Sequence, residues 1–336
     1  MQVTGRIEGT PPASVGSAPM VICIPVYNDW QLVPELVRRI DRTLCGMNSS
    51  SILVLVDDCS AEPPPSRFSL EYRALRQVYL LRLRCNLGHQ RAIAIGLAYI
   101  HDHFQCRSIV IMDGDGEDAP EDIPRLLSRF ESCGESHVVF ARRARRLETP
   151  VFRGFYKAYR LLHWLLTGRS VEVGNFSVLS MDHAASLVGV SELWNHYAAS
   201  VFKVRLLRQM VPIDRGRRIA GRSKMSFTSL VTHGLSAISV FADTVGVRLL
   251  VLNAVFALLC VIGVMLVLVI RLLTDLAIPG WATLAAGILF IFLVQSILLS
   301  LVFVFVTLQG RNTSTFLPIR DYQYFVGAVR RLDTDE

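Results

Sequence analysis

Acidic residues are crowded into one short stretch of the chain. Residues 113–118 read DGDGED, which places four carboxylates within six positions. Crowding like charges is unfavourable unless a cation lies among them, and hard oxygen ligands suit Mg²⁺ or Mn²⁺ bridging a diphosphate. A lone cluster of this kind would more simply be a solvated turn in which Asp118 caps a helix starting near Pro120. A second acidic pair, Asp57 and Asp58, favours a site for a metal ion and a nucleotide.

Both acidic clusters directly follow short apolar runs of the kind that form buried strands. We expect strands at residues 20–24, 51–56, 78–83, 108–112 and 138–141, and helices at residues 32–44 and 89–101. Alternation of strands and helices is typical of an α/β domain with a mostly parallel sheet and helices on both faces. Ligands of such sheets bind beyond the carboxyl ends of the strands, and the two acidic clusters fall at that edge.

Two uncharged apolar runs follow in the C-terminal part of the chain, at residues 249–270 and 281–308. A helix needs roughly 20 apolar residues to cross the hydrocarbon core of a bilayer. Hydrophobic residues make up 51% of the chain, which is more than a soluble domain of this length usually carries. We therefore expect two transmembrane helices, joined by a tight hairpin at Pro279 and Gly280, rather than two buried helices of a soluble protein.

Most arginines near these runs lie on their outer flanks, at Arg248, Arg311, Arg320, Arg330 and Arg331. By the positive-inside rule, both termini and the α/β domain are expected on the cytoplasmic side of the cell inner membrane. The remaining divisions are a flexible tail at residues 1–19, the α/β domain at 20–225, an interfacial juxtamembrane segment at 226–248 and a cytoplasmic tail at 311–336.

The net charge of +7 is concentrated in one region. Residues 137–225 hold 16 arginines and lysines against 5 aspartates and glutamates. Two interpretations stay open, namely contact with anionic lipid and binding of phosphate groups. Nucleic acid is not an expected partner, because aromatic residues do not interleave with the basic ones. The seven cysteines show no metal-ligand spacing, so we expect them to be reduced and mostly buried.

Several short motifs resemble, in their order and spacing, those of family 2 glycosyltransferases, which have the GT-A fold. They are PVYN at residues 25–28, VDDCS at 56–60, NLGHQ at 86–90, and Asp113-x-Asp115 followed by Pro120 and Glu121. Two later motifs, GNFS at 174–177 and RIAGRSK at 218–224, are similar to those of polyprenyl-phosphate sugar transferases. That type includes dolichyl-phosphate mannose synthases, bactoprenol glucosyltransferases and undecaprenyl-phosphate aminoarabinose transferases.

The resemblance implies a Rossmann-like GT-A domain followed by a two-helix membrane hairpin, and it implies roles for individual residues. Those that would bind the nucleotide-sugar are Pro25, Tyr27, Asp57, Asp58 and Asp113, and those that would hold Mg²⁺ or Mn²⁺ are Asp113, Asp115 and Glu117. Those implied in catalysis are Asp115, Arg142 and Arg218. Contacts to the lipid phosphate or the diphosphate would come from Arg153, Lys157, Ser223 and Lys224.

Three positions depart from the family pattern. Cys59 stands where glycine is usual, and a turn with positive φ would be strained by a side chain, so we expect the local loop to differ there. Glu117 stands where glutamine is common, which should make the metal site more anionic, and Arg222 replaces a frequent acidic residue. None of the three removes an expected catalytic group.

The activity implied by the resemblance is transfer of a sugar from a UDP- or GDP-sugar to a polyprenyl phosphate, with inversion at the anomeric carbon. A phosphate acceptor is already ionised at neutral pH and needs no general base. We therefore expect His89, His183 and His196 to be structural, with Glu192 as an alternative candidate on the acceptor side. The expected partners are the nucleotide-sugar, the polyprenyl phosphate and membrane lipid, and a homo-oligomer stays open.

Two other functions are compatible with these residues. One is a membrane glycosyltransferase that makes polysaccharide or glycolipid, but such synthases usually carry a Q-x-x-R-W motif and more spanning helices, neither of which occurs here. The other is a non-catalytic scaffold that binds nucleotide-sugar or lipid. The acidic loop argues against a scaffold, since binding alone needs no metal site.

Overall fold

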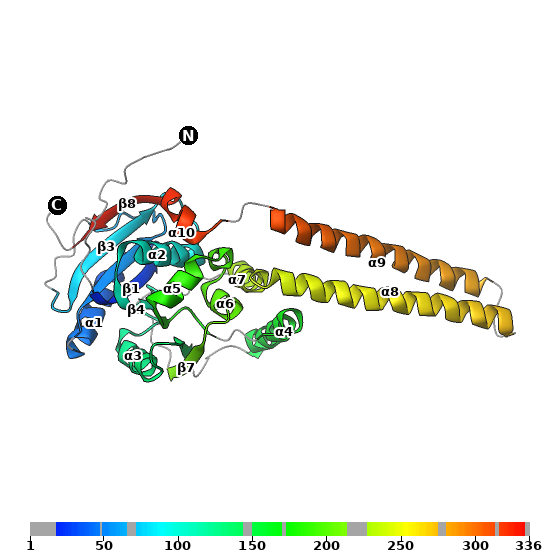
Figure 1. Cartoon of the computed structure of the whole chain (residues 1–336), viewed down its shortest axis with the longest axis horizontal. Coiled ribbons are helices and arrows are strands. Elements are labelled where there is room, and N and C mark those ends of the chain that lie inside the picture. The colour runs from blue at the N-terminus through cyan, green and yellow to red at the C-terminus, as the bar shows by residue number, and fades with distance from the viewer. Residues whose placement is uncertain are drawn as a thin grey trace. The chain divides into compact units, whose positions relative to one another are not determined.

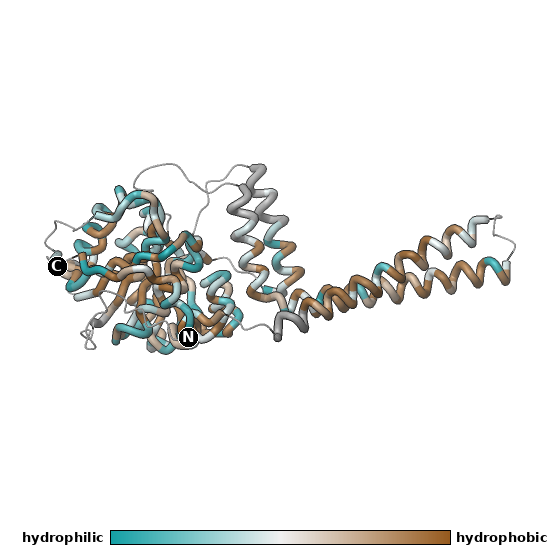
Figure 2. Tube along the Cα trace, turned by 90° about the horizontal axis from the view of Figure 1, so that it is seen from above, coloured by the Kyte–Doolittle hydropathy of each residue, from teal (hydrophilic) through white to brown (hydrophobic). Residues whose placement is uncertain are grey.

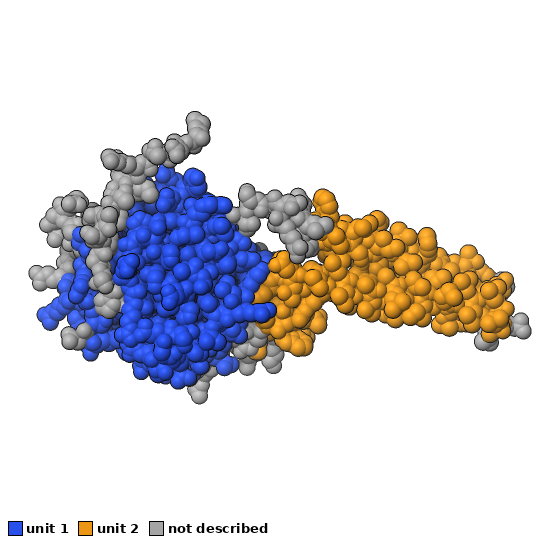
Figure 3. Space-filling model, viewed as in Figure 1, with its two compact units in different colours: residues 1–154, 171–240, 315–336 blue, residues 155–170, 241–314 orange. Residues whose placement is uncertain are grey.

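A computed structural model of the chain describes residues 18–47, 49–65, 72–143, 150–169, 173–213, 227–274, 280–312 and 316–332. The chain forms two compact units, which have different colours in Figure 3. The first unit contains residues 1–154, 171–240 and 315–336, and the second contains residues 155–170 and 241–314.

The first unit is built on a sheet that has eight strands in the described part of the chain, in the order β7-β5-β6-β4-β1-β2-β3-β8 (Figure 1). Their bounds are β1 Ala18–Val26, β2 Ser51–Asp57, β3 Leu75–Leu83, β4 Cys106–Ile111, β5 Val138–Arg143, β6 Ser177–Ser180, β7 Arg208–Ile213 and β8 Val326–Arg331. β4, β1, β2 and β3 run parallel, β6 is antiparallel to β4 and β5, and β8 is antiparallel to β3. Every residue of β2 is buried, as in strands covered on both faces. The mostly parallel α/β sheet predicted from the sequence is confirmed.

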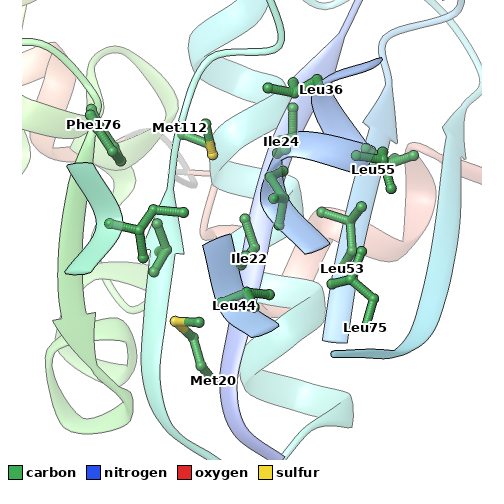
Figure 4. Close-up of a cluster of buried hydrophobic side chains, with 14 of the residues drawn as sticks. Met20, Ile22, Ile24, Leu36, Leu44, Leu53, Leu55, Leu75, Met112 and Phe176 are labelled. Atoms are coloured by element: carbon green, nitrogen blue, oxygen red, sulfur yellow. The ribbon is translucent and has the colours of Figure 1, made fainter. Parts of the chain in front are cut away.

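Helices cover both faces of this sheet. Those described around it are α1 Val33–Gly46, α2 His89–His103, η1 Pro120–Asp122, α3 Ile123–Ser132, α5 Met181–Val188, η2 Ser191–Trp194 and α6 Tyr197–Lys203. A further helix, α7 Phe227–Ser239, precedes residues 241–314 of the second unit in the chain. On one face, Ile22 and Ile24 of β1 share a buried cluster with Leu36 of α1 (Figure 4). On the other face, Gly96 of α2 lies so close to β1 that an added Cβ would be 2.6 Å from the sulfur of Cys23. The two predicted helices are therefore α1 and α2.

The segment after the second long helix returns to the first unit and joins its sheet. It forms α10 Pro318–Asp321, η3 Tyr322–Tyr324 and then β8. The hydroxyl of Tyr322 donates to Asp102 at 2.6 Å, and the N–H of Arg84 donates to the carbonyl of Phe325 at 2.8 Å. The prediction of a tail at residues 311–336 is wrong for residues 316–332, because Tyr322, Val326 and Val329 are buried against the domain.

The second unit consists mainly of two long helices, α8 (Ala242–Leu273) and α9 (Trp281–Asn312), which are largely hydrophobic along their length (Figure 2). Both are long and apolar enough to cross a membrane, and only 11% and 6% of their most apolar stretches are buried. Core helices of a soluble protein would be mostly buried. The predicted pair of apolar helices is confirmed, although α8 begins at Ala242, before the expected start at residue 249.

Polar side chains fix how the two long helices pair. Asn253 of α8 donates to the carbonyl of Ser296 and to the hydroxyl of Ser300, both at 2.6 Å. The Ser296 hydroxyl donates back to the Asn253 side chain at 3.0 Å. Hydrogen bonds between membrane helices contribute only about 0.6 kcal/mol each, so their main effect is to select one register.

The C-terminal part of α4 (Pro150–Thr167) belongs to the same unit as these helices. Arg248 of α8 donates to the carbonyl of Leu165 at 2.8 Å. The guanidinium of Arg169 lies 5.4 Å from the ring centre of Phe241. A cation that binds the free carbonyls at the end of a helix stabilises that end, so Arg248 attaches α4 to the base of α8.

We predict that Tyr322→Phe lowers the stability of the first unit by about 1 kcal/mol, the net contribution of one hydrogen bond. For a domain of this size, that corresponds to a melting temperature about 2–4 °C lower. Thermal unfolding followed by circular dichroism measures the shift. Tyr324→Phe is a matched control because Tyr324 is 74% exposed. Equal melting temperatures for the two variants would contradict the docking of this segment.

Candidate active site

Three loops meet at one edge of the sheet. Because β4, β1 and β2 are adjacent and parallel, their carboxyl ends share that edge. Asp113 follows β4, Tyr27 follows β1, and Asp57 ends β2. Tyr27 is 48% exposed, whereas Pro25 is buried within β1. The topology thus brings together residues from motifs that are far apart in the sequence.

Asp57 is a fully buried carboxylate with unused bonding capacity. One oxygen accepts the N–H of Ser60 at 3.2 Å. The other oxygen has no hydrogen-bond partner in the described part of the chain, and the Nε of Arg82 lies 3.6 Å from it. A buried charged oxygen without a hydrogen bond is unfavourable. The Arg82 guanidinium therefore supplies the positive charge that this buried oxygen faces.

Asp58, the next residue, is engaged by the chain itself. Its two carboxylate oxygens accept the N–H groups of Leu87 and Gly88 at 2.7 and 2.8 Å. Burial raises the pKa of Asp58, although these two N–H groups act in the opposite direction. Its carboxylate therefore fixes the loop that leads into α2, next to the expected nucleotide site.

The turn after Asp58 is left-handed although a cysteine occupies it, so the expectation that the local loop differs there is wrong. Cys59 has a φ of 57°, and Asn28 in the facing loop has a φ of 53°. The N–H of Asn28 donates to the Ser60 hydroxyl at 2.9 Å, and the Asn28 side chain accepts the N–H of Ala61 at 2.8 Å. These bonds join the ends of β1 and β2 and hold Cys59 in a conformation that a side chain disfavours.

The acidic loop is closed by its own backbone. The N–H of Asp113 donates to the carboxylate of Asp118 at 2.9 Å, and the N–H of Glu117 donates to that of Asp115 at 3.0 Å. Asp118 is not the cap of the following helix, because Ala119 occupies that position before η1. An aspartate that caps a helix and one that closes a loop can have the same neighbours in sequence, so the sequence alone does not distinguish these two roles of Asp118.

Neighbouring elements fix the position of this loop. A Cβ on Gly114 would lie 2.9 Å from the carbonyl oxygen of Pro25, so the chain approaches β1 more closely than any other residue allows. Arg39 of α1 donates two hydrogen bonds to Glu121, at 2.9 and 2.6 Å. The glycine between the two aspartates and the glutamate after Pro120 therefore have structural roles.

His89 and Asn175 contact the first aspartate of the loop. The Nε2 of His89 lies 3.0 Å from Asp113 Oδ1, and the side-chain nitrogen of Asn175 lies 3.3 Å from the same oxygen. Burial lowers the pKa of His89, but the charges of Asp113, Asp118 and Asp115 outweigh it, so the pKa lies above its ordinary value. The sequence predicts only a structural role for His89. Its position at the start of α2, next to the end of β4, indicates a role at the site.

The other two histidines have the structural roles expected of them. His183 accepts and donates in a capping box with Ser180 at the start of α5, and burial lowers its pKa. The His196 side chain accepts the N–H of Ala199 at the start of α6. Glu192, the alternative acceptor-side candidate, forms an ion pair with Lys203 at 2.7 Å. Burial is the largest single influence and raises the pKa of Glu192, but the hydrogen bond and charge of Lys203 together with the other hydrogen bonds to the carboxylate outweigh it, so the pKa is lowered.

The expected basic residues are described to different extents. Arg142 lies near the end of β5 with an exposed side chain, at the same edge of the sheet as Asp113. For Arg153 and Lys157, only their backbone positions on α4 are described. Arg218, Ser223 and Lys224 lie outside the described residues.

The acidic loop fits a divalent cation only in part. Among the described residues, no group of three or more His, Cys, Asp or Glu side chains is arranged to hold a metal. Mg²⁺, however, is commonly held by one or two carboxylates together with substrate phosphates and water. Asp113 and Asp115 could supply such a pair, with Glu117 further along the same loop. The assignment of these three residues to a metal remains a prediction.

The comparison with known proteins agrees with this architecture. Residues 21–187 match the model of glycosyl transferase family 2. The chain carries a family 2 glycosyltransferase domain. The match begins in β1 and ends in α5, so it includes Asp57, Asp113 and Asn175. This match confirms the expected enzyme class, a transferase. It also agrees with the expected GT-A type of sheet.

Relatives extend the similarity beyond the family 2 domain. The chain is 25% identical, over 299 residues, to an undecaprenyl-phosphate 4-deoxy-4-formamido-L-arabinose transferase of Klebsiella pneumoniae, covering 86% of each chain. It is 24% identical over 287 residues to an uncharacterized glycosyltransferase of Synechocystis, covering 84% of this chain and 87% of that protein. Coverage this large must include part of the two long apolar helices.

Two solved structures are similar to part of the chain. Glucosyl-3-phosphoglycerate synthase from Mycobacterium tuberculosis, in complex with Mn²⁺, UDP-glucose and phosphoglyceric acid, has a TM-score of 0.47 and 15% identity, covering 70% of this chain and 82% of that chain. Mannosyl-3-phosphoglycerate synthase from Rubrobacter xylanophilus has a TM-score of 0.46 and 14% identity, covering 67% and 73%.

We predict that Cys59→Gly stabilises the family 2 domain by about 0.5–1 kcal/mol, because glycine removes the strain of the positive φ while adding freedom to the unfolded chain. Its melting temperature should rise by about 2–4 °C per kcal/mol. Cys85→Gly is the matched control, because exposed Cys85 does not have a positive φ and glycine should be neutral or destabilising there. A lower melting temperature for Cys59→Gly would show that the cysteine side chain stabilises the turn.

Proposed function

We propose that this protein transfers a glycosyl group from a UDP- or GDP-linked sugar to a polyprenyl phosphate, with inversion at the anomeric carbon. One combination carries the proposal: a family 2 domain with carboxylates converging at one sheet edge, in the same chain as two helices long and apolar enough to cross a membrane. The relative named for an undecaprenyl-phosphate substrate aligns over both parts, which supports a polyprenyl phosphate acceptor.

The nucleotide would bind at the ends of β1 and β2. The unpartnered oxygen of Asp57 would accept a hydrogen bond from the ribose or the base. Tyr27, half-exposed after β1, would pack against the nucleotide, and Asp58 would hold the adjoining loop. Pro25 supplies the carbonyl against which Gly114 packs, so it couples this site to the acidic loop.

The sugar diphosphate would lie beside the acidic loop. Asp113 and Asp115, with Glu117 nearby, would hold Mg²⁺ or Mn²⁺. A bound cation would neutralise charge on the departing diphosphate. The N–H groups of Asp113 and Glu117 donate to the carboxylates of Asp118 and Asp115, respectively. These bonds hold the loop in place before any ligand arrives.

The transfer itself requires that two anions be brought together. An oxygen of the acceptor phosphate forms a bond to the anomeric carbon while the bond from that carbon to the diphosphate oxygen breaks and its electron pair leaves with the diphosphate. The ionised phosphate needs no base, so positive charge is the main requirement. Arg142 would stabilise the acceptor phosphate at the sheet edge. Arg153, Lys157, Arg218, Ser223 and Lys224 are the further candidates for the two phosphate groups.

The acceptor would be reached at a membrane surface. In the second unit, α4 exposes the apolar side chains of Leu161, Leu162, Trp164 and Leu165 next to exposed Arg160. A helix with apolar and basic residues of this kind suits the headgroup region of a bilayer. The expected placement of the domain and both termini on the cytoplasmic side rests on the arginines that flank the two apolar helices.

We predict that Asp57→Asn weakens nucleotide binding about 10- to 100-fold, since a hydrogen bond to a charged group contributes about 1.5–3 kcal/mol. Calorimetric titration with UDP and with GDP, each with Mn²⁺, measures the dissociation constants. Glu35→Gln on α1 is the control, because its side chain pairs with Arg38 on the surface. An unchanged dissociation constant for Asp57→Asn with either nucleotide would remove Asp57 from the site.

We predict that Asp115→Asn lowers sugar transfer about 10²–10³-fold, the usual effect of removing one group that stabilises charge in the transition state. The assay supplies radiolabelled UDP- and GDP-sugars and undecaprenyl phosphate in detergent with Mg²⁺ or Mn²⁺. Labelled lipid should form from one donor, disappear when the metal is chelated, and persist with Glu35→Gln. A folded wild-type protein that labels no lipid from any donor would overturn the acceptor assignment. A product with retained anomeric configuration would overturn the single in-line step.

A further inference from the structure

A chain of side-chain amides joins α6 to the acidic loop. The backbone N–H of Tyr197 donates to Oε1 of Gln90 at 2.7 Å, and Nε2 of Gln90 donates to Oδ1 of Asn175 at 3.1 Å. The side-chain nitrogen of Asn175 then lies 2.9 Å from Nε2 of His89 and 3.3 Å from Oδ1 of Asp113. Gln90 and Asn175 are each only 9% exposed, so water does not compete strongly for these bonds.

One backbone group sets the direction of every bond in this chain. The N–H of Tyr197 can only donate, so Gln90 must turn its carbonyl oxygen towards Tyr197 and its NH₂ group towards Asn175. Asn175 must then use its oxygen for Gln90 and present its NH₂ group to Asp113 and to Nε2 of His89. The orientation of an amide is normally open to a flip, but here a group that cannot reverse removes that freedom.

The pairing of the strands places Asn175 between the donor and acceptor sides. Ile111 of β4 and Phe140 of β5 both pair with Ser177 of β6. Continuing these two antiparallel registers by two residues sets Asn175 opposite Asp113 on one side and opposite Arg142 on the other. The N–H of Ala141 donates to the carbonyl of Phe176 at 2.9 Å, which continues the second register towards Asn175.

We propose that Gln90 and Asn175 are positioning residues that hold the carboxylate of Asp113 for the donor, through an amide relay whose polarity is set by the Tyr197 N–H. This proposal rests on the proposed function. The relay directs a donor group at Oδ1 of Asp113, so that the carboxylate keeps one orientation towards the donor. The Nε2 of His89 lies 3.0 Å from the same oxygen and 2.9 Å from the Asn175 nitrogen, so the three side chains meet at one point. Neither Gln90 nor Asn175 takes part in bond making.

The test reverses the relay without touching Asp113. In Gln90→Glu, one carboxylate oxygen still accepts the Tyr197 N–H, but the other faces Asn175 as an acceptor. Asn175 must then turn its NH₂ group towards Glu and its oxygen towards Asp113. Groups that orient metal ligands contribute about 10- to 100-fold to metal affinity. We expect the dissociation constant of Mn²⁺, measured by electron paramagnetic resonance alone and with UDP or GDP present, to rise at least about tenfold.

The sign of the effect separates orientation from charge. The added carboxylate alone would attract a cation and tighten Mn²⁺ binding, so weaker binding reports the reversed amide. Unchanged or tighter Mn²⁺ binding by Gln90→Glu would overturn the relay. Ser177→Ala is the matched control, because the fully buried Ser177 hydroxyl contacts Tyr197 and the Asn175 backbone but not the Asn175 amide. A similar loss in Ser177→Ala would show that packing, and not polarity, is responsible.

Acidification provides a second readout. A buried glutamate has a raised pKa, and its protonated form can again donate to Asn175 and restore the relay. The ratio of variant to wild-type dissociation constants should therefore shrink between about pH 8 and about pH 6. A ratio that stays constant over this range contradicts the relay. If the wild type binds Mn²⁺ but transfers no sugar, the proposed function fails. If the wild type binds Mn²⁺ and transfers sugar, and Gln90→Glu is fully active as well, only the relay is refuted.

Discussion

Negative charge gathered at one edge of a sheet is the constraint on which the rest of this structure depends. Four aspartates, Asp57, Asp58, Asp113 and Asp115, follow or end strands whose parallel course brings them to the same edge. Such crowding is unfavourable in a protein unless each carboxylate finds N–H groups or positive charge. The loops at this edge are folded around that need, with their backbone N–H groups turned towards the carboxylates.

The acidic residues at this edge differ in their hydrogen bonds. Asp58 and Asp118 accept N–H groups of the chain and thereby shape the loop before α2 and the loop after β4. Asp57 has a buried oxygen without a hydrogen-bond partner in the described ranges, with Arg82 3.6 Å away, and Asp113 contacts His89 and Asn175. Loops whose carboxylates already accept backbone N–H groups are preorganised, because they need not rearrange when an anionic ligand and a cation arrive.

Much of the fold and part of the site could be predicted from sequence because the signals are local. The first five strands and the first two helices follow from continuous apolar runs and helical spacing, and the strain at Cys59 follows from one residue in one motif. The contacts of His89 and Asn175 with Asp113 could not be predicted, because they join residues far apart in the sequence through β4, α2 and β6. β6, with four residues, is too short for its pattern to stand out.

The C-terminal strand also escaped prediction, for a different reason. β8 is a short run of mixed polarity, and its partner β3 lies more than 200 positions earlier in the chain. Its apolar residues Val326 and Val329 become buried only when the strand pairs with the edge of β3. Non-local strand pairing of this kind depends on the assembled sheet and not on any window of sequence.

The position of β8 in the chain has a consequence for how the protein is made. Synthesis proceeds from the N-terminus, so both apolar helices leave the ribosome before the strand that completes the sheet. Until then, the edge of β3 is unpaired and open to association with other chains. The domain therefore cannot close its sheet until its hairpin has been translated, and a chain that stalls within α9 would carry an incomplete domain. In a single polypeptide, a completed sheet therefore means that both long apolar helices have already been synthesised.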